Sequence, residues 1–143
     1  MKTSFFLGGR ENDTFFGGSG TDQLVGLAGN DELRGNGGFD ALTGGAGDDD
    51  LFGGASSDVF FFDGTDDDDT IHDFELGSDT MFFIGTAITS KSQLSFQTFD
   101  ADGDSQIDDA FVSYQVGGVF SSITVLNVDG QTLATTDSAF NVL

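Results

Sequence analysis

Large apolar residues recur every nine positions over the N-terminal part of the chain. Each follows an Asp by two residues and a Gly by seven, and the glycines are at 8, 17, 26, 35, 44 and 53. A flexible Gly/Asp-rich linker does not keep an apolar residue at one phase of a nine-residue period, so the pattern indicates an internal repeat. The repeated apolar residues are Phe15, Leu24, Leu33, Leu42, Leu51 and Phe60.

Each nine-residue unit predicts one turn and one short strand. The Gly-rich stretch that ends in Asp favours a turn, because Gly tolerates positive φ. The following three residues form a strand whose central apolar side chain points to one side. Two units make one 18-residue coil, so six units predict about three coils of a right-handed parallel β-roll. The apolar side chains would fill the space between its two sheets, and the predicted fold class is all-β.

Strand patterns continue on both sides of the repeats. Ser4–Leu7 has Ser in place of the repeated Asp and predicts an initial strand, and 69–72 and 79–82 predict further strands on a lost glycine framework. Leu94–Phe99 and Ala110–Val116 alternate as strands.

A hairpin of 111–116 and 119–128 around Gly117 and Gly118 is expected to pack over the open end of the roll. We therefore expect a roll with its N-terminal strand over 1–61 and a β-strand cap over 62–143. The two regions are expected to pack as one continuous domain.

Composition sharpens this picture through charge. The 143 residues carry 25 Asp and Glu against 4 Lys and Arg, for a formal net charge of −21, together with 17 Phe. The Phe content predicts a packed core, whereas the uncompensated charge opposes compaction, so a cation from outside the chain is needed. So few basic residues exclude nucleic acid and anionic membrane as direct partners, and no apolar run is long enough to insert in a membrane.

Several kinds of site are also excluded. The chain has no Cys and one His, which rules out thiolate chemistry and His-rich zinc sites. The N-terminal apolar run is only Phe5–Leu7, followed by Arg10 and Glu11, which does not fit a secretion signal peptide. Export would therefore need another route.

The repeated Asp residues predict a cation site at each edge of the roll. Coils stack about 4.8 Å apart, and carboxylates at that distance repel by about 1 kcal/mol even in water. A hard dication between them would reverse this, and carboxylate with carbonyl oxygen specifies Ca²⁺. Asp13, Asp31 and Asp49 would stack on one edge, and Asp22, Asp40 and Asp58 on the other.

The pattern Gly-Gly-x-Gly-x-Asp-x-U-x, with U a large apolar residue, resembles the calcium-binding nonapeptide of the RTX (repeats in toxin) family. The resemblance covers 54 of the 143 residues. The second position departs from it at Leu27 and Asn36, and the fourth at Glu11 and Ser56, where distorted turns are expected. Since main-chain oxygens are the ligands there, Leu27 and Asn36 need not abolish their sites.

The resemblance implies a ligand set for each calcium ion. One turn supplies its Asp and the second and fourth carbonyls, and the turn one coil later supplies its Asp and the first and third carbonyls. The first implied site is Gly9, Glu11 and Asp13 with Gly26, Ala28 and Asp31. The second is Gly18, Gly20 and Asp22 with Gly35, Gly37 and Asp40. The third is Leu27, Gly29 and Asp31 with Gly44, Ala46 and Asp49. The fourth is Asn36, Gly38 and Asp40 with Gly53, Ala55 and Asp58.

The acidic segment after the repeats resembles the region that follows such arrays in serralysin-type proteases and alginate epimerase R-modules. In those families acidic residues here complete the last calcium sites, which makes Asp63, Asp69 and Asp73 candidate ligands. Asp66–Asp68 are expected to form a solvated acidic loop instead.

A second calcium candidate lies between two predicted strands. Asp100, Asp102, Asp104 and Asp108 have acidic offsets that resemble an EF-hand loop. Ser105 and Phe111 stand where that loop has Gly and Glu, and no helices flank it. The alternative is an Asp/Gly turn that is merely acidic. Together the sites predict about four to seven calcium ions.

Other side chains have competing interpretations. His72 beside Asp73 suggests catalysis, but adjacent strand residues point to opposite faces and cannot form a dyad, so a strand His and no enzyme activity are expected. Four phenylalanines are expected to face outward and could stack on sugar rings, although packing against the C-terminal cap is the favoured role. These residues are Phe16, Phe39, Phe52 and Phe61.

These expectations define one leading function. The chain is predicted to be an extracellular calcium-binding module, largely disordered without calcium, that folds on binding it outside the cell. Its apolar C-terminus, 137–143, resembles the uncleaved signal of type I secretion, which makes that machinery an expected partner, although many domains end in an apolar strand. The alternative is a calcium-dependent polysaccharide-binding or matrix module. A complete protein and the terminal domain of a longer one remain open.

Overall fold

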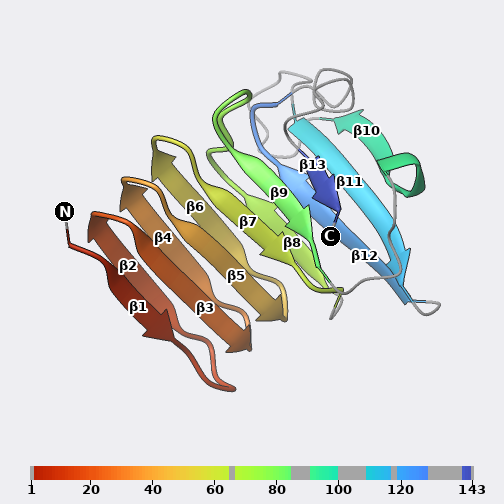
Figure 1. The fold of residues 1–143 in the computed structure, drawn as a ribbon. Coiled ribbons are helices and arrows are strands. Elements are labelled where there is room, and N and C mark those ends of the chain that lie inside the picture. The colour runs from red at the N-terminus through yellow and green to blue at the C-terminus, as the bar shows by residue number, and fades with distance from the viewer. Residues whose placement is uncertain are drawn as a thin grey trace.

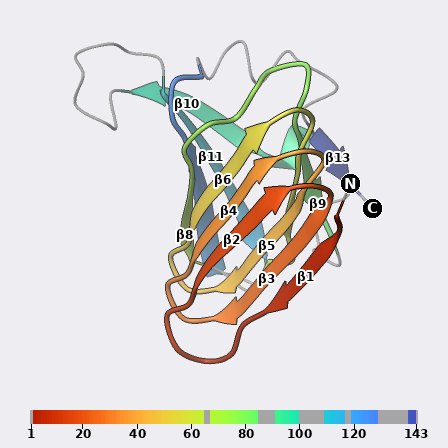
Figure 2. The same ribbon diagram turned by 90° about the vertical axis from the view of Figure 1, so that its left-hand side faces the viewer.

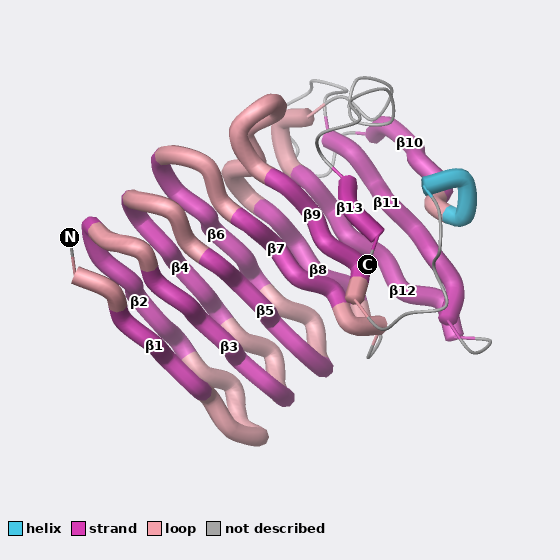
Figure 3. Tube along the Cα trace, viewed as in Figure 1, coloured by secondary structure: helices cyan, strands magenta, loops and turns pink. Residues whose placement is uncertain are grey.

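The computed structural model describes residues 2–64, 67–84, 91–99, 109–116, 119–128 and 140–142. Within them the chain winds into a parallel β-roll of about four turns that ends in antiparallel strands (Figures 1 and 3). The predicted all-β class and parallel roll are confirmed. Among the described residues there is no helix with the length and apolar composition needed to cross a membrane.

One face of the roll is a six-stranded sheet in which β13 is the last strand. Its pairs are all parallel, with partners 18 residues apart in the array, such as Leu24↔Leu42. In spatial order the strands are β1 (Ser4–Leu7), β3 (Asp22–Ala28), β5 (Ala41–Ala46), β7 (Val59–Phe62), β9 (Thr80–Phe83) and β13 (Phe140–Val142).

The other face is a seven-stranded sheet, parallel across the roll and antiparallel at its C-terminal end. Between β10 and β11 lie the residues that include Asp100–Asp108, and η1 (Lys91–Gln93) precedes β10. In spatial order the strands are β2 (Thr14–Ser19), β4 (Glu32–Gly37), β6 (Asp50–Ala55), β8 (Asp68–Ile71), β12 (Val119–Val125), β11 (Asp109–Val116) and β10 (Ser95–Phe99).

Strands in the array are longer than the predicted three residues. The residues at the second position of the turns stay in register with the next coil, as in Gly18↔Asn36 and Leu27↔Gly45. The peptide groups of these residues can therefore join the inter-coil ladder, and β2 to β6 reach six or seven residues. The strands predicted at both flanks are present as β1, β8 and β9, which lengthens the roll beyond the six units.

The predicted apolar residues form the core between the sheets. Leu24, Leu33, Leu42, Leu51 and Phe60 are fully buried. Phe15 lies in the first coil, is only half-buried and stacks on Phe6, because no further coil covers that end.

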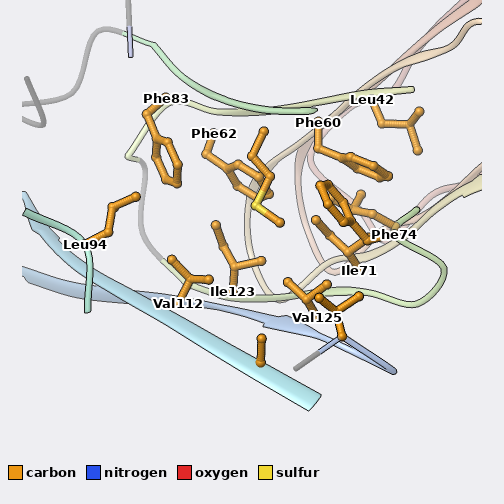
Figure 4. Packing of buried hydrophobic residues seen from close by; sticks show 14 of the residues in the cluster. Leu42, Phe60, Phe62, Ile71, Phe74, Phe83, Leu94, Val112, Ile123 and Val125 are labelled. Carbon is orange, nitrogen blue, oxygen red and sulfur yellow. The ribbon is translucent and has the colours of Figure 1, made fainter. Parts of the chain in front are cut away.

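The C-terminal strands extend this same core. β11 and β12 form the predicted antiparallel hairpin, and β12 pairs in parallel with β8. The hairpin thus continues the seven-stranded sheet edge to edge. Figure 4 shows Val112 and Ile123 on the opposite side of the core from Phe62 and Phe83, and Val125 is paired with Ile71 within the seven-stranded sheet.

Candidate metal centres

Two rows of Asp side chains run parallel to the axis of the roll, one along each edge, as predicted. In each row the Oδ1 atom of an Asp accepts a hydrogen bond from the backbone N–H of the Asp one coil earlier. Asp13 donates to Asp31 at 2.7 Å and Asp31 to Asp49 at 2.8 Å. On the other edge, Asp22 donates to Asp40 and Asp40 to Asp58, both at 2.8 Å.

Both rows continue beyond the nonapeptide repeats. The N–H of Asp49 donates to Asp69 Oδ1 at 3.1 Å, and that of Asp58 donates to Asp79 Oδ1 at 2.8 Å. The steps are 20 and 21 residues instead of 18, since the loops are longer. We call Asp13, Asp31, Asp49 and Asp69 the first Asp ladder, and Asp22, Asp40, Asp58 and Asp79 the second Asp ladder.

Asp79 was not among the predicted site residues, yet it is 1% exposed and ends the second Asp ladder. Its Oδ2 atom accepts the N–H of Glu75. The available signal was its position before Thr80 and Met81, which fits the Asp-x-U pattern. By itself the pattern predicts the strand there and not a metal ligand.

The remaining oxygen of several ladder residues has no partner in the described structure. The Oδ2 atoms of Asp31, Asp40, Asp49 and Asp58 are buried and accept no hydrogen bond. Burying a carboxylate oxygen without a partner is costly unless a cation compensates it. These four atoms are therefore the clearest sign in the structure that a positive ion belongs at the turns.

The turns leave no space for a side chain beside these oxygens. A Cβ added to Gly17 would lie 2.6 Å from the carbonyl oxygen of Gly35 and 2.8 Å from Asp22 Oδ2. Each first-position carbonyl therefore lies close to the turn one coil earlier. Residues 8, 17, 26, 35, 44 and 53 thus need to be Gly in order to keep the oxygens close together.

Other carbonyls lie toward the turn one coil later. A Cβ added to Gly29 would lie 2.6 Å from the carbonyl oxygen of Glu11, which is a fourth position. Added to Gly45 or Gly54, it would collide with the carbonyl oxygen of Leu27 or Asn36, which are second positions. Oxygens from both turns thus converge on the space between them.

Three of the four departures from the repeat keep the positive φ of the regular turns, so the expected distortion is absent there, whereas Glu11 does not have the positive φ of the later fourth positions. Leu27 and Asn36 have φ of 84° and 77°, close to the 112° and 99° of Gly45 and Gly54 at the same position of their units. Ser56 likewise has φ of 94° at a fourth position. The backbone keeps its course through Leu27 and Asn36, although such a φ is strained for Leu.

Burial and mutual repulsion shift the titration of the ladder residues. Burial, and behind it the charge of neighbouring carboxylates, raises the pKa of Asp49 and of Asp58 to about 7. The same causes raise the pKa of Asp69 to about 8. Burial also raises the pKa of Asp31, Asp40, Asp73 and Asp79. Without a cation the structure therefore disfavours the ionised carboxylates that its sequence supplies.

The donor set fits a hard cation. Within the part of the chain that the structure describes, no group of three or more His, Cys, Asp and Glu side chains is placed to hold a metal ion by itself. The converging oxygens are instead two stacked carboxylates and several carbonyls. Such all-oxygen sets suit Ca²⁺.

The predicted flanking residues have different positions. Asp73 accepts the N–H groups of Gly53 and Gly54 at 2.8 and 3.0 Å, so it closes the last turn of the second edge. Asp63 is exposed and lines a narrow hollow together with Asp67 and Asp69. Asp69 and Asp73 are thus built into the roll, and Asp63 lies beside it.

The predicted solvated loop is more ordered than expected. Asp67 Oδ2 accepts the N–H of Gly47 at 2.7 Å. Asp68 is the first residue of β8 and accepts the hydroxyl of Ser122. Both residues are exposed, as expected of a solvated segment, but Asp68 belongs to a strand and both side chains accept hydrogen bonds from other parts of the roll. Asp66 lies outside the described residues.

The second calcium candidate falls mostly outside the description. Asp100, Asp102, Asp104 and Asp108 are not among the described residues, and the strands predicted on both sides are present as β10 and β11. Asp109 is fully buried in β11 and accepts the N–H of Asn127 at 2.7 Å.

The side chains of His72 and Asp73 do not meet in a dyad. His72 Nε2 lies 2.6 Å from Asp50 Oδ1, while Asp73 binds the Gly53–Gly54 turn. The ring of His72 stacks on the ring of Phe52, with 4.2 Å between their centres. The guanidinium of Arg34 lies 3.6 Å from the centre of the Phe52 ring.

The outward phenylalanines do not share one role. Phe52 contacts Arg34 of β4 and His72, which follows β8, and Phe61 packs on Phe82 of the neighbouring strand. Phe52 and Phe61 thus each contact a residue of 62–143, as the favoured role expects, although His72 and Phe82 belong to the continuation of the roll and not to the β11–β12 hairpin. Phe16 and Phe39 are 56% and 50% exposed.

Comparison with known proteins agrees with this geometry. Residues 5–33 and 25–60 match the family model of the RTX calcium-binding nonapeptide repeat, in four copies. No curated protein sequence gives a significant match to the chain.

Solved structures resemble the whole roll. The R3 and R2 subunits of the mannuronan C5-epimerase AlgE6 from Azotobacter vinelandii align with TM-scores of 0.66 and 0.62, at 24% and 20% identity. The alignments cover 96% and 93% of this chain and 80% and 91% of those chains. Extracellular lipase LipA from Serratia marcescens aligns over 92% of this chain at 27% identity with a TM-score of 0.62, and this chain spans 20% of the lipase.

The nine-residue period, the stacked aspartates and the family match describe the same segment. Residues 5–60 are therefore an array of RTX calcium-binding nonapeptide repeats, wound as a parallel β-roll.

Proposed function

We propose that this chain is an extracellular module whose folding depends on calcium and which couples type I export to folding. The observation that carries the proposal is the set of four buried, unpartnered Oδ2 atoms in the two Asp ladders. A chain with a net charge of −21 cannot supply the cations that these atoms need. Bound calcium would supply positive charge at the turns, and its binding energy would become folding energy.

The array residues that would hold calcium are those of the implied ligand sets. Support comes from the direction of the carbonyls. The carbonyl oxygens of second and fourth positions, such as Leu27 and Glu11, lie against the turn one coil later. Those of first positions, such as Gly35, lie against the turn one coil earlier. The four sites of the array would therefore each combine oxygens of two successive coils.

We extend the same arrangement beyond the array. Asp49 with Asp69, and Asp58 with Asp79, repeat the stacking seen within it. Asp73 would contribute at the second of these places, since it closes the Gly53–Gly54 turn. Two further ions would give six, within the expected range of about four to seven.

Export and folding would be coupled through calcium concentration. Extracellular calcium modules bind at about 10⁻⁴–10⁻³ M, so the chain would stay unfolded in a calcium-poor cytosol and fold outside. The likeness to an extracellular lipase supports the location. We also propose that 1–61 and 62–143 fold as one domain, because β12–β8 and β13–β9 join them around one core.

Circular dichroism tests the folding proposal. In excess chelator the spectrum should be that of a largely disordered chain. Millimolar calcium should convert it to a β-rich spectrum, and the same concentration of magnesium should not. A spectrum already β-rich in chelator would overturn the proposal.

Polysaccharide binding is a second candidate function, favoured by the likeness to R subunits of a mannuronan C5-epimerase. The exposed rings of Phe16 and Phe39 are available for stacking on sugars. Phe52 is less so, because Arg34 and His72 both contact its ring. The acidity of the chain disfavours polyanionic sugars unless calcium bridges them.

A glycan-binding screen with and without calcium tests this second function. Calcium-dependent binding that is lost in Phe16→Ala supports it, and the absence of binding in both conditions excludes it. We propose no catalytic role. Hydrolytic activity that disappeared in His72→Ala would contradict that proposal.

A further inference from the structure

The outer face of the six-stranded sheet carries no charged side chain across β1, β3, β5, β7 and β9. Alternate residues of these strands point away from the core and form two rows in register, for example Phe5↔Gln23 and Leu7↔Val25. We call this surface the uncharged face. Its residues are Phe5, Leu7, Gln23, Val25, Ala41, Thr43, Val59, Phe61, Thr80 and Phe82.

The opposite outer face is different in kind. Across β4, β6 and the end of β8, the outward residues include Glu32 and Arg34, which form an ion pair, and Asp50 and His72, which lie in hydrogen-bonding contact. Charged residues make up 20% of the whole chain, which corresponds to about two in ten positions, and the ten outward positions of this face have none. The absence of charge is thus a property of one face and does not follow from the roll itself.

The uncharged face is also apolar and accessible. Phe5 and Leu7 are 62% and 57% exposed, and Phe61 and Phe82 pack on each other in a tilted arrangement with ring centres 5.5 Å apart. Figure 2 shows no described strand or helix lying over the outer side of β1, β3 and β5. A contiguous apolar surface of this kind on a highly charged molecule indicates an interaction site.

We propose that the uncharged face binds the same face of a second copy of this chain, in a two-fold dimer with two sheets packed face to face. Two chains that each carry 25 acidic and only 4 basic residues repel wherever their acidic surfaces meet. This face lets two copies approach without opposing charges. Sheets with apolar outer rows pack in this way at about 10 Å.

The small size of the uncharged face limits the affinity of the proposed dimer. Its ten residues are fewer than the roughly 20–30 residues per side of a standard interface. We therefore expect a weak dimer that forms as the protein concentration rises. Because the roll brings the rows together, the dimer should form only in the folded, calcium-loaded chain.

Analytical ultracentrifugation of the full chain in millimolar calcium tests the proposal. The wild type should change from monomer to dimer with concentration. Val25→Lys and Thr43→Lys each place a charge at the middle of the uncharged face and should weaken the dimer at least about tenfold. Thr14→Lys adds the same charge on the outer face of β2 and should leave the dimer unchanged. Circular dichroism in calcium identifies variants that still fold.

Three results would overturn the proposal. The wild type could stay monomeric up to about 1 mM. Val25→Lys and Thr43→Lys could fold and dimerise like the wild type, which would place the contact elsewhere, for instance on the free edges of β1 and β2. Thr14→Lys could weaken the dimer as much as Val25→Lys. A β-rich dimer that persists in chelator would contradict calcium-dependent folding, while leaving the uncharged face as the interface.

Discussion

Each ladder aspartate uses its two oxygens for different purposes. In Asp49, Oδ1 accepts the N–H of Asp31, while Oδ2 is buried without a partner beside Gly44. The carboxylate of a ladder residue with a coil on each side therefore borders two proposed ion sites, one toward the earlier coil and one toward the later coil. Removal of its charge should affect two proposed ion sites at once.

Asp49→Asn tests this sharing. The amide oxygen can still accept the N–H of Asp31, but one negative charge is lost from two proposed sites. We expect fewer bound ions and a calcium midpoint of folding raised by about tenfold. Asp48→Asn is the matched control, because Asp48 is exposed and its Oδ1 only accepts the N–H of Asp68. Equal midpoints for the two variants would contradict the role of Asp49.

Leu27 shows how a backbone conformation restricts the side chain. Its φ of 84° is a conformation that Gly adopts without strain, and the Leu side chain is 45% exposed. Leu27→Gly should therefore stabilise the calcium-loaded roll by about 1 kcal/mol, measured by urea unfolding. Asn36→Gly should change stability less, since Asn tolerates positive φ. A loss of stability in Leu27→Gly would show that its side chain contributes more than the strain costs.

Along the seven-stranded sheet, side chains from successive coils stack outside the core. Arg34 of β4 covers the ring of Phe52 of β6, and the same ring stacks with His72, which follows β8. The His72–Asp50 pair adds a second link between β6 and the end of β8. These contacts fasten the first segment beyond the repeats to the array.

Phe52→Ala should release that segment. We expect the free energy of unfolding in calcium to fall by about 2 kcal/mol, and hydrogen exchange to rise around 72–79. Phe16→Ala removes an exposed ring at the same position of another unit and should change stability by less than about 0.5 kcal/mol. Similar losses in both variants would contradict a specific role for the stack.

The elements differ in how well the sequence predicts them. A strict period places Leu24 to Phe60 and the stacked aspartates, because every unit repeats the same local requirement. Asp79 was missed because its coil has 21 residues between ladder partners, so that the period is lost. The path of β12 beside β8, and the return of Asp67 to the N–H of Gly47, depend on distant pairing that no local pattern encodes.

For the molecule as a whole, charge and folding are linked through protons. Burial and neighbouring carboxylates raise the pKa of Asp49 and Asp58 to about 7 and that of Asp69 to about 8. In the unfolded chain an Asp has a pKa of about 4. Without calcium, the folded chain therefore binds protons that the unfolded chain releases between these values.

The sign of the resulting pH dependence follows from this difference. In chelator, the free energy of unfolding should be largest below about pH 4 and should decrease as the pH rises through about 7–8. Any β-structure in chelator should therefore increase when the pH is lowered from 8 to 5, as seen by circular dichroism. In calcium the order should reverse, because the ligand carboxylates must be ionised. Loss of β-structure on acidification in chelator would contradict the pKa shifts.

The most direct test of the calcium ladders is the number of ions bound by the folded chain. Metal counting on protein equilibrated in millimolar calcium should give between four and seven ions per chain, and the ions should bind over the same calcium range in which β-structure forms. Fewer than three ions, or binding that leaves the circular dichroism spectrum unchanged, would contradict the account.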